Sequence, residues 1–306
     1  MGKRVLFVLN PTAGRGEIRT HLLDVVQLLT EAGCSVTVHP TSGPGEIAPL
    51  LKQCGEDYDL ILSSGGDGTL NETISGLMEL QRRPLLSYLP AGTVNDTATN
   101  LRLPHGTLAA AEVAITGVPT PMDVQSFNDR WFFYVAAFGL FTDVAYATPQ
   151  EQKHVWGRLA YLMQGVRALS DVQSYRVRLE LEEQTVEDEV IFGAVCSTTS
   201  VGGFHPPAIQ ERVDLRDGLS EVLLVRRPKT LADFSNMASA LLRLDFDSPY
   251  FYFAQTRHAR LTFDESVPWT LDGEYGGDVR EVEIRNHPGA IQIMCPSSLP
   301  SASLSR

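Results

Sequence analysis

The sequence predicts an α/β protein of two domains, with an N-terminal parallel-sheet domain over residues 1–122 and a C-terminal β-rich domain over residues 123–289. Short apolar segments alternate with helical stretches from Lys3 to Met122, which is typical of parallel strands covered by helices. After Pro119–Pro121 the pattern changes to apolar–polar alternation, which favours strands. The chain has 306 residues, which is long for one hydrophobic core and suits two.

In the first domain, Lys3–Leu9 is predicted as the first strand, and Tyr58–Leu62 and Ser87–Leu89 as two later strands. Each is a short apolar run that ends at a loop rich in Gly, Asn, Asp or Thr. Between the strands, apolar residues recur at helical spacing, as Leu70 and Ile74 do. The predicted helices are Ile18–Ala32, Glu46–Cys54, Leu70–Leu80 and Thr107–Thr116.

The second domain is expected to hold one or two inserted helices, around Val155–Ser170 and Leu231–Leu244. Its β-branched and aromatic runs favour strands. A last strand, Ala290–Met294, precedes a Ser-rich tail, Ser297–Arg306, which is expected to fray. The predicted strands are Trp131–Ala137, Tyr175–Glu182, Val190–Cys196, Glu221–Val225, His258–Phe263 and Arg280–Arg285.

The stretch SSGGDGTLNETISG at residues 63–76 is the most informative part of the chain. It places Gly65, Gly66 and Gly68 between an apolar strand and a helix, so the backbone can approach a ligand closely. Backbone N–H groups beside a helix N-terminus suit an anionic phosphate. Asp67 adds a negative charge, which fits such a site if a divalent cation bridges it to the ligand. The alternative is a tight turn that Asp67 caps.

Two further strand ends carry similar loops, NPTAGRG at residues 10–16 and PAGTVND at residues 90–96. In an open α/β sheet, ligands bind in the crevice outside the carboxyl ends of the strands. Three loops at matching positions therefore predict a nucleotide or phosphate site there.

These three segments, in this order and spacing, resemble the nucleotide-binding domain of the diacylglycerol kinase family, and most closely its soluble bacterial lipid kinases. Downstream, LDGE at residues 271–274 resembles the family's segment that supplies the general base. DLRDGL at residues 214–219 resembles a loop that holds a structural magnesium in several bacterial members. The resemblance implies an NAD-kinase/diacylglycerol-kinase-like first domain, which residues 290–306 with their strand Ala290–Met294 would complete, and a C-terminal β-sandwich domain.

The resemblance also implies roles for particular residues. Asp67 would hold a catalytic Mg²⁺, and Glu274 would accept the proton of a lipid hydroxyl as it attacks the γ-phosphorus of ATP. Asp214, Asp217 and the Leu219 carbonyl would hold a structural Mg²⁺. An Asp-Gly pair is also a strong hairpin signal, so LDGE has a purely structural alternative. The residues expected to contact nucleotide are Asn10, Thr41, Gly65, Gly66, Asp67, Gly68, Thr69, Leu70, Asn71, Thr93 and Asn95.

Other nucleotide-binding patterns are absent from the sequence. There is no G-x-x-x-x-G-K-[ST] motif, no G-x-G-x-x-G after a strand, and no protein-kinase motif set. The net charge is −12, which argues against a nucleic-acid partner because nucleic-acid binding needs a basic face. The expected partner is instead a lipid substrate at a membrane surface, as the resemblance implies.

The four cysteines share no spacing of a metal site or disulfide framework, which indicates reduced thiols in a cytosolic protein. The chain begins directly with a strand, and no signal peptide is visible. Trp131–Ala147 carries Asp143 and falls short of the run of about 20 apolar residues that spans a bilayer. We therefore expect a cytoplasmic protein, peripheral at the membrane, without a transmembrane segment. The oligomeric state stays open, with a homodimer as one option.

Three functions fit the sequence. The first is an ATP- and Mg²⁺-dependent lipid kinase acting on diacylglycerol or a related lipid. The second is a soluble small-molecule kinase of the NAD-kinase type, which shares GGDGT at residues 65–69 but not GTVND or DGE. The third is a nucleotide- or lipid-binding protein without turnover, against which the presence of both Asp67 and Glu274 argues.

Overall fold

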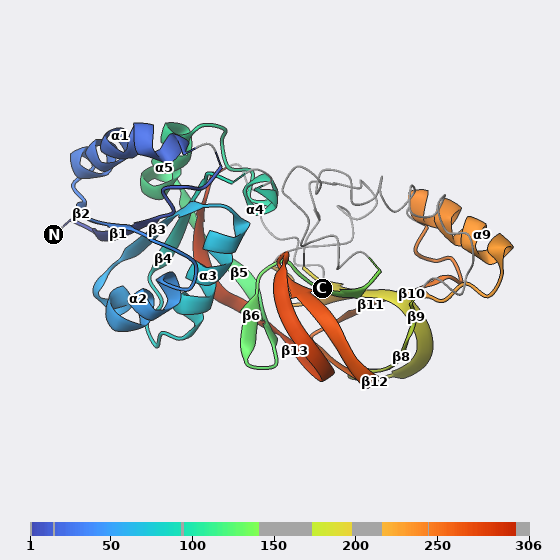
Figure 1. The fold of residues 1–306 in the computed structure, drawn as a ribbon. Coiled ribbons are helices and arrows are strands. Elements are labelled where there is room, and N and C mark those ends of the chain that lie inside the picture. The colour runs from blue at the N-terminus through green and yellow to red at the C-terminus, as the bar shows by residue number, and fades with distance from the viewer. Residues whose placement is uncertain are drawn as a thin grey trace. The chain divides into compact units, whose positions relative to one another are not determined.

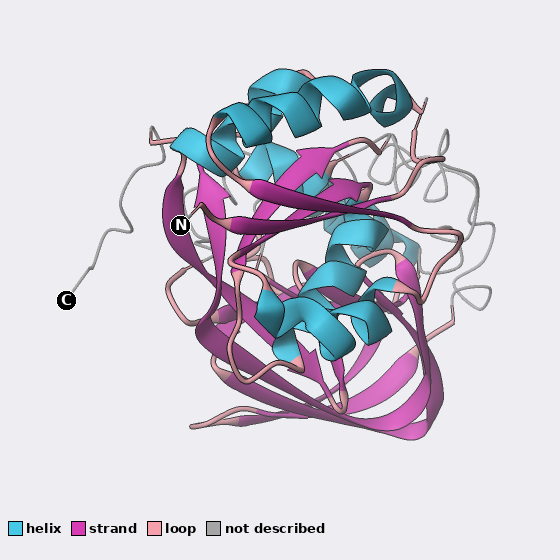
Figure 2. Ribbon diagram, turned by 90° about the vertical axis from the view of Figure 1, so that its left-hand side faces the viewer, coloured by secondary structure: helices cyan, strands magenta, loops and turns pink. Residues whose placement is uncertain are grey.

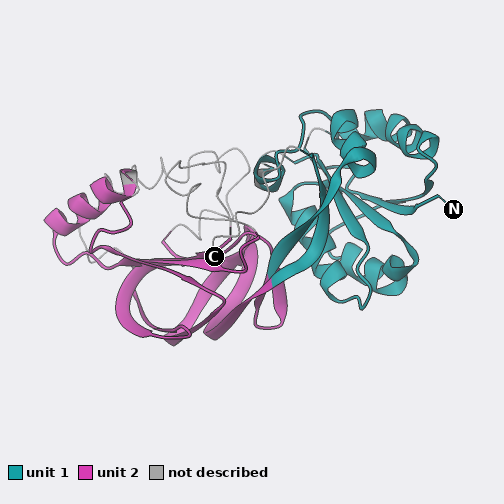
Figure 3. Ribbon diagram, turned by 180° about the vertical axis from the view of Figure 1, so that it is seen from behind, with its two compact units in different colours: residues 1–124, 288–306 teal, residues 125–287 magenta. Residues whose placement is uncertain are grey.

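The computed structural model describes residues 2–14, 16–92, 95–140, 173–197, 216–243 and 245–297 (Figure 1). The chain divides into two compact units, which Figure 3 colours separately. Unit 1 comprises residues 1–124 and 288–306, and unit 2 comprises residues 125–287. Two strands, β5 (Val118–Phe127) and β13 (Glu274–Cys295), belong in part to each unit. The predicted fold class, an α/β domain followed by a β-rich domain, is confirmed.

Unit 1 is built on a parallel sheet in the order β2-β1-β3-β4-β13. Its central strands are buried and carry apolar side chains on both faces, as in Val5–Leu9 of β1, where every side chain but the last is at most 1% exposed. The last strand arrives from far along the chain, with Ile293 of β13 paired to Leu86 of β4. The other strands are β1 (Arg4–Leu9), β2 (Ser35–Pro40), β3 (Leu60–Gly65) and β4 (Leu85–Pro90).

Helices cover both faces of this sheet (Figure 2). On one face α1 packs on α5, and on the other α2 packs on α3. Their apolar stripes supply Ile18, Val25 and Leu29 of α1 and Leu70, Ile74 and Leu77 of α3 to the core. The helical elements are α1 (Glu17–Glu31), α2 (Ile47–Cys54), η1 (Gly55–Asp57), α3 (Asp67–Met78), α4 (Asp96–Asn100) and α5 (Thr107–Thr116).

The start of α3 differs from the sequence prediction. The helix was expected from Leu70, but it begins at Asp67, directly after Gly66. Strand β3 continues to Gly65, so a single residue separates strand from helix. Glycine can adopt the backbone conformation of β3 or of α3. The negative charge of Asp67 in the first turn stabilises α3, because the N-terminus of a helix carries partial positive charge. Most of the expected glycine loop is therefore the first turn of α3.

Unit 2 is antiparallel and curls around its own core. The long strands β9 (Thr185–Cys196) and β12 (His258–Leu271) each pair with β8 (Tyr175–Glu180) at one end and with β7 (Val135–Gly139) at the other. Trp269 lies at the centre of that core and contacts the rings of Phe127, Phe138 and Phe263. The remaining elements are β6 (Arg130–Phe132), β10 (Ser220–Arg226), helix α9 (Leu231–Leu242) and β11 (Phe251–Thr256).

Several strand predictions were wrong in their bounds; β9 and β12, for example, are longer than the predicted Val190–Cys196 and His258–Phe263. The single strand expected over Trp131–Ala137 is interrupted between β6 and β7, because the backbone N–H groups of Phe133 and Tyr134 donate to the Asp272 carboxylate. The two strands expected around residues 280–285 and 290–294 are one long strand, β13, which accommodates Pro288 and the positive φ of Gly289. The helix expected at residues 155–170 lies outside the described residues.

Replacing Trp269 by Ala is expected to lower the free energy of unfolding by about 3–5 kcal/mol, since the side chain is fully buried and its removal leaves a cavity among three aromatic rings. Urea denaturation followed by circular dichroism measures this. The control is Leu231→Ala on α9, where the side chain is 62% exposed and the change should stay within about 0.5 kcal/mol. Equal losses in the two variants would contradict this account of the core.

Candidate functional site

The strand order places the topological switch point of the sheet at the carboxyl ends of β1 and β3. Strand β1 lies between β2 and β3 in the sheet. The chain leaves β1 toward β2 on one side and leaves β3 toward β4 on the other, so the two connections run in opposite directions. This is the switch point at which open α/β sheets bind ligands. Asn10 and Gly65 stand at these two strand ends, and the Asn10 N–H donates to the Ser64 carbonyl at 2.8 Å. The sequence-predicted loops therefore meet at the expected edge of the sheet.

The side-chain oxygen of Asn10 forms hydrogen bonds within the first loop. Its Oδ1 accepts hydrogen bonds from the Thr12 N–H at 3.0 Å and the Thr12 hydroxyl at 2.9 Å. Within the described part of the chain, its Nδ2 group donates to no residue. An amide donor thus remains available at the end of β1.

Thr41 lies at the end of β2 and is tied to β1. Both its N–H and its hydroxyl donate to the Leu9 carbonyl, at 2.9 and 3.3 Å, and the residue is buried. Thr41 is therefore adjacent to the same sheet edge as Asn10, with its hydroxyl proton engaged.

The second and third loops touch through glycine. A Cβ atom at position 92 would lie 2.7 Å from the Gly66 Cα and 2.7 Å from the Asn95 Oδ1, so only glycine allows this approach. The Ala91 N–H donates to the Gly65 carbonyl at 2.8 Å. Helix α3 has no side-chain cap at Gly66, and the N–H groups of a first helical turn have no partner within the helix. The backbone at Gly66–Thr69 is thus suited to an anion.

Asn95 closes the third loop on itself. Its Oδ1 accepts from the Gly92 N–H and its Nδ2 donates to the Gly92 carbonyl, both at 2.9 Å. Its backbone adopts a left-handed conformation with φ of 54°, which Asn tolerates better than most residues. The hydrogen bonds of the Asn95 side chain therefore fix the conformation of its own loop.

Tyr88 is a site residue that the sequence reasoning missed. Its buried hydroxyl lies 3.0 Å from the Gly65 carbonyl and 3.3 Å from the Asn95 Oδ1, so it links the second loop to the third. Burial, and secondly the negative charge of Asp67, raise the pKa of Tyr88 well above its ordinary value. The hydroxyl thus stays protonated and donates. The signal in the sequence was a tyrosine two residues before a strand end.

Asp67 is half-buried in the first turn of α3. Its Oδ1 accepts the Thr97 N–H at 3.2 Å, so the second and third loops also meet here. The contact uses the backbone of Thr97, and the residue itself is buried. A carboxylate in the first turn of a helix has the oxygen ligands that a phosphate-bridging Mg²⁺ requires.

The remaining predicted nucleotide residues differ in what they offer. Leu70 is 1% exposed, so only its backbone could face a ligand. Gly68 is exposed, and Thr69 and Asn71 are half-buried on α3. Thr93 lies outside the described residues.

In unit 2, Glu274 follows a two-residue hairpin turn made by Asp272 and Gly273. Both have positive φ, 50° and 86°, and Leu271 pairs directly with Glu274. The buried Asp272 carboxylate accepts the N–H groups of Phe133, Tyr134 and Val135 at 2.7, 3.0 and 2.9 Å. The hairpin alternative for LDGE is thus present, and it holds the exposed Glu274 on a turn anchored to the β6–β7 loop.

The predicted structural magnesium loop is described in part. The Asp217 Oδ1 accepts the Leu219 N–H at 2.9 Å, and the Leu219 carbonyl accepts the Asn286 Nδ2 at 2.9 Å. The Ser197 hydroxyl also donates to this carbonyl, at 3.4 Å, so both of its lone pairs have a donor nearby. Asp214 lies outside the described residues, and among those described no three His, Cys, Asp or Glu side chains form a metal cluster.

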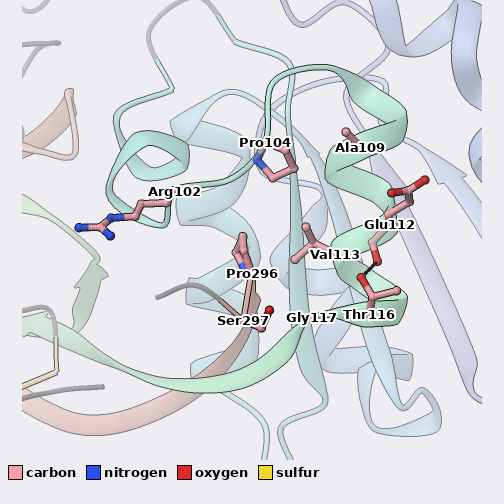
Figure 4. A pocket seen from close by; sticks show the side chains of 9 residues that line it. All are labelled: Arg102, Pro104, Ala109, Glu112, Val113, Thr116, Gly117, Pro296 and Ser297. Atoms are coloured by element: carbon pink, nitrogen blue, oxygen red, sulfur yellow. Dashed lines mark hydrogen bonds between the residues drawn. The ribbon is translucent and has the colours of Figure 1, made fainter. Parts of the chain in front are cut away.

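A surface pocket of about 460 Å³ lies elsewhere in unit 1, at the end of α5 and the last residues after β13 (Figure 4). Arg102 and Glu112 line its rim, with their charged ends directed away from the centre (Figure 4). None of the predicted site residues lines this pocket. It has no convergent polar groups, so we do not assign it to the chemistry.

Together, the strand order and loops of unit 1 define an α/β domain whose strand ends suit an anionic ligand, and the chain also contains a β-rich unit. The comparisons with known proteins specify this class. Residues 4–127 match the model of the diacylglycerol kinase catalytic domain, and residues 136–295 match the YegS C-terminal NAD kinase beta sandwich-like domain.

Full-length relatives and solved structures agree with these matches. The chain is 33% identical to the diacylglycerol kinase of Bacillus subtilis (strain 168) over 278 residues, which covers 90% of this chain and 91% of that protein. It is 29% identical to the diacylglycerol kinase of Staphylococcus carnosus (strain TM300), covering 99% of each. A putative diacylglycerol kinase from Bacillus anthracis str. Sterne shares the fold, with a TM-score of 0.81 at 23% identity, covering 97% of this chain and 98% of that one. The chain belongs to the diacylglycerol kinase family and is a lipid kinase.

Replacing Tyr88 by Phe is expected to lower the free energy of unfolding by about 1 kcal/mol, because one hydrogen bond is lost while both acceptors keep their backbone donors. Urea denaturation measures the change. In Tyr58→Phe the hydroxyl that is removed bonds to no described residue, so this control should unfold like the wild type. A Tyr88→Phe variant as stable as the control would show that the link is energetically neutral.

Replacing Asp272 by Asn is expected to cost about 2–3 kcal/mol of stability, since the amide keeps one acceptor oxygen and turns N–H donors toward the N–H groups at residues 133–135. Thermal unfolding detects the loss. Asp129→Asn, at an exposed carboxylate, is the matched control and should leave the transition unchanged. Similar melting of both variants would refute the anchoring role of Asp272.

Proposed function

We propose that this protein transfers the γ-phosphate of ATP to the hydroxyl of diacylglycerol or a closely related lipid, with Mg²⁺ as cofactor. The relatives named diacylglycerol kinase support this substrate class. The observation that carries the proposal is the meeting of three loops at one sheet edge, where Gly66 and Gly92 nearly touch and Asp67 opens α3. A bare backbone beside one carboxylate suits a metal-bound triphosphate.

We assign nucleotide binding to residues 1–122, completed by residues 290–306, and lipid binding with the general base to residues 123–289. The backbone of Gly65, Gly66, Gly68 and Leu70 would hold the phosphates, with side chains of Thr69 and Asn71 adding contacts. Asn10, Thr41, Thr93 and Asn95 would flank the nucleotide. The available amide donor of Asn10 supports this assignment. The Asn95 side chain makes hydrogen bonds to Gly92, so we assign it a second role in shaping its loop.

Two magnesium sites are part of the proposal. Asp67 would hold the catalytic ion, which when bound neutralises charge on the phosphates. Asp214, Asp217 and the Leu219 carbonyl would hold a structural ion. The oxygen donors of both sets suit Mg²⁺.

Glu274 is the proposed general base. Its carboxylate accepts the proton of the lipid hydroxyl as the hydroxyl oxygen forms a bond to the γ-phosphorus. The bond between that phosphorus and the β–γ bridging oxygen breaks, ADP leaves, and the lipid becomes a phosphate monoester. The anchored Asp272–Gly273 turn fixes the backbone from which Glu274 projects.

The lipid hydroxyl resides at a membrane surface, so the protein would act there from the cytoplasm as a peripheral enzyme. None of the helices in the described ranges has the length and hydropathy that a membrane crossing requires. We propose that it acts without a nucleic-acid partner, which its net charge of −12 supports.

The test measures transfer from γ-labelled ATP with Mg²⁺ into mixed micelles that contain diacylglycerol or other lipid alcohols. Asp67→Ala and Glu274→Gln are each expected to lower kcat by at least about 100-fold, since each removes a group that acts on the reacting phosphate or hydroxyl. Glu265→Gln, an exposed glutamate on β12, is the control and should keep wild-type activity. Label in a soluble acceptor only would favour a small-molecule kinase, and ATP binding without transfer would favour a non-catalytic binding protein.

A further inference from the structure

Helix α2 begins at an acidic side chain that comes from another helix. The N–H of Ile47, the first residue of α2, donates to the Glu72 Oε1 of α3 at 2.7 Å. Glu46, which precedes the helix, makes no side-chain cap on α2. The negative charge of Glu72 thus lies at the positive end of α2, where it stabilises the helix.

The same face of α3 makes the close packing with α2. Gly76, one turn after Glu72, would place a Cβ atom 2.9 Å from the Ala48 Cα, so the two helices meet at backbone contact. Positions four apart lie on one helix face. Glu72 and Gly76 together therefore fix the start of α2 against α3.

The segment Thr41–Glu46 is consequently held at both ends. At its start, Thr41 bonds through its N–H and its hydroxyl to the Leu9 carbonyl of β1. At its end, Ile47 is bound by Glu72. Between them the segment closes on itself, with the Ser42 N–H donating to the Glu46 Oε2 at 2.9 Å. Hydrogen bonds therefore connect this segment to β1 at its start and to α3 at the residue that follows it.

We propose that Glu72 is a positioning residue for nucleotide binding, which holds the Thr41–Glu46 segment in place relative to the Gly65–Asn71 segment. The inference rests on the proposed nucleotide site. Glu72 lies on the same helix whose first turn contains Asp67, Gly68 and Thr69, so one rigid element carries both the phosphate-binding backbone and the tether of the neighbouring loop. Without this hydrogen bond, the Thr41–Glu46 segment would become ordered only when the nucleotide binds. The entropy cost of that ordering would lower the affinity for the nucleotide.

The chemistry of the contact separates two substitutions. Glu72→Ala removes the acceptor of the Ile47 N–H, whereas Glu72→Gln keeps a carbonyl oxygen at the same distance along the side chain. Glu112→Ala, an exposed glutamate on α5, removes the same charge from unit 1 and is the matched control.

The experiment measures the affinity of the full chain for ADP with Mg²⁺ by titration calorimetry, and amide hydrogen exchange over residues 42–48. Glu72→Ala is expected to weaken ADP binding by roughly 5- to 10-fold and to speed exchange in that segment, as loss of a charge-assisted hydrogen bond predicts. Glu72→Gln should stay within about twofold of the wild type, because a hydrogen-bond acceptor remains. At saturating ATP, kcat should be unchanged in all three variants.

Faster exchange without a change in ADP affinity would make Glu72 a helix cap alone and would overturn the inference. Unchanged exchange in Glu72→Ala would overturn it too, as would a fall in kcat with unchanged KM for ATP. A wild-type chain with no measurable ADP affinity would refute the proposed function together with this inference, so the two failures are distinguishable.

Discussion

The candidate site depends on the carbonyl group of Gly65. It accepts the Ala91 N–H and lies within hydrogen-bonding distance of the Tyr88 hydroxyl, so the end of β3 is fixed to the loop after β4. With that carbonyl held, Gly66 turns the chain into α3, and the lack of a side chain at Gly92 lets the neighbouring loop close in. The helix N-terminus, the Asp67 carboxylate and the third loop are positioned by this one arrangement.

A second constraint organises unit 2 in a comparable way. The Asp272 carboxylate is buried, and burying a charge is costly unless hydrogen bonds compensate for it. Three consecutive backbone N–H groups supply that compensation, at residues 133–135. The same contact interrupts the strand that an apolar sequence pattern would continue, and it fixes the hairpin from which Glu274 projects. In each unit, one group therefore holds both the local fold and a proposed site residue in place: the Gly65 carbonyl in unit 1 and the Asp272 carboxylate in unit 2.

Much of the fold follows from the order of residues. Apolar runs at β1, β3 and β4 and helical periodicity in α1, α2, α3 and α5 predict the parallel unit to within a few residues. Strand β2 carries no fully buried side chain in its pattern, which is why its segment, Ser35–Pro40, gives a weak signal. In β13, Pro288 and Gly289 suggest a break, yet the strand continues because its pairing with other strands outweighs local preference.

The sequence alone determines which loops carry the chemistry, because glycine, Asn and Asp at strand ends are local signals that need no partner to be recognised. It also determines the family, through the spacing of GGDGT, GTVND and LDGE. Only the tertiary structure shows that Asn95 bonds to its own loop, that Tyr88 joins two loops, and that Glu72 holds the start of another helix. Such roles depend on distances between residues far apart in the chain, or on side-chain orientation, and neither leaves a periodic pattern in the sequence.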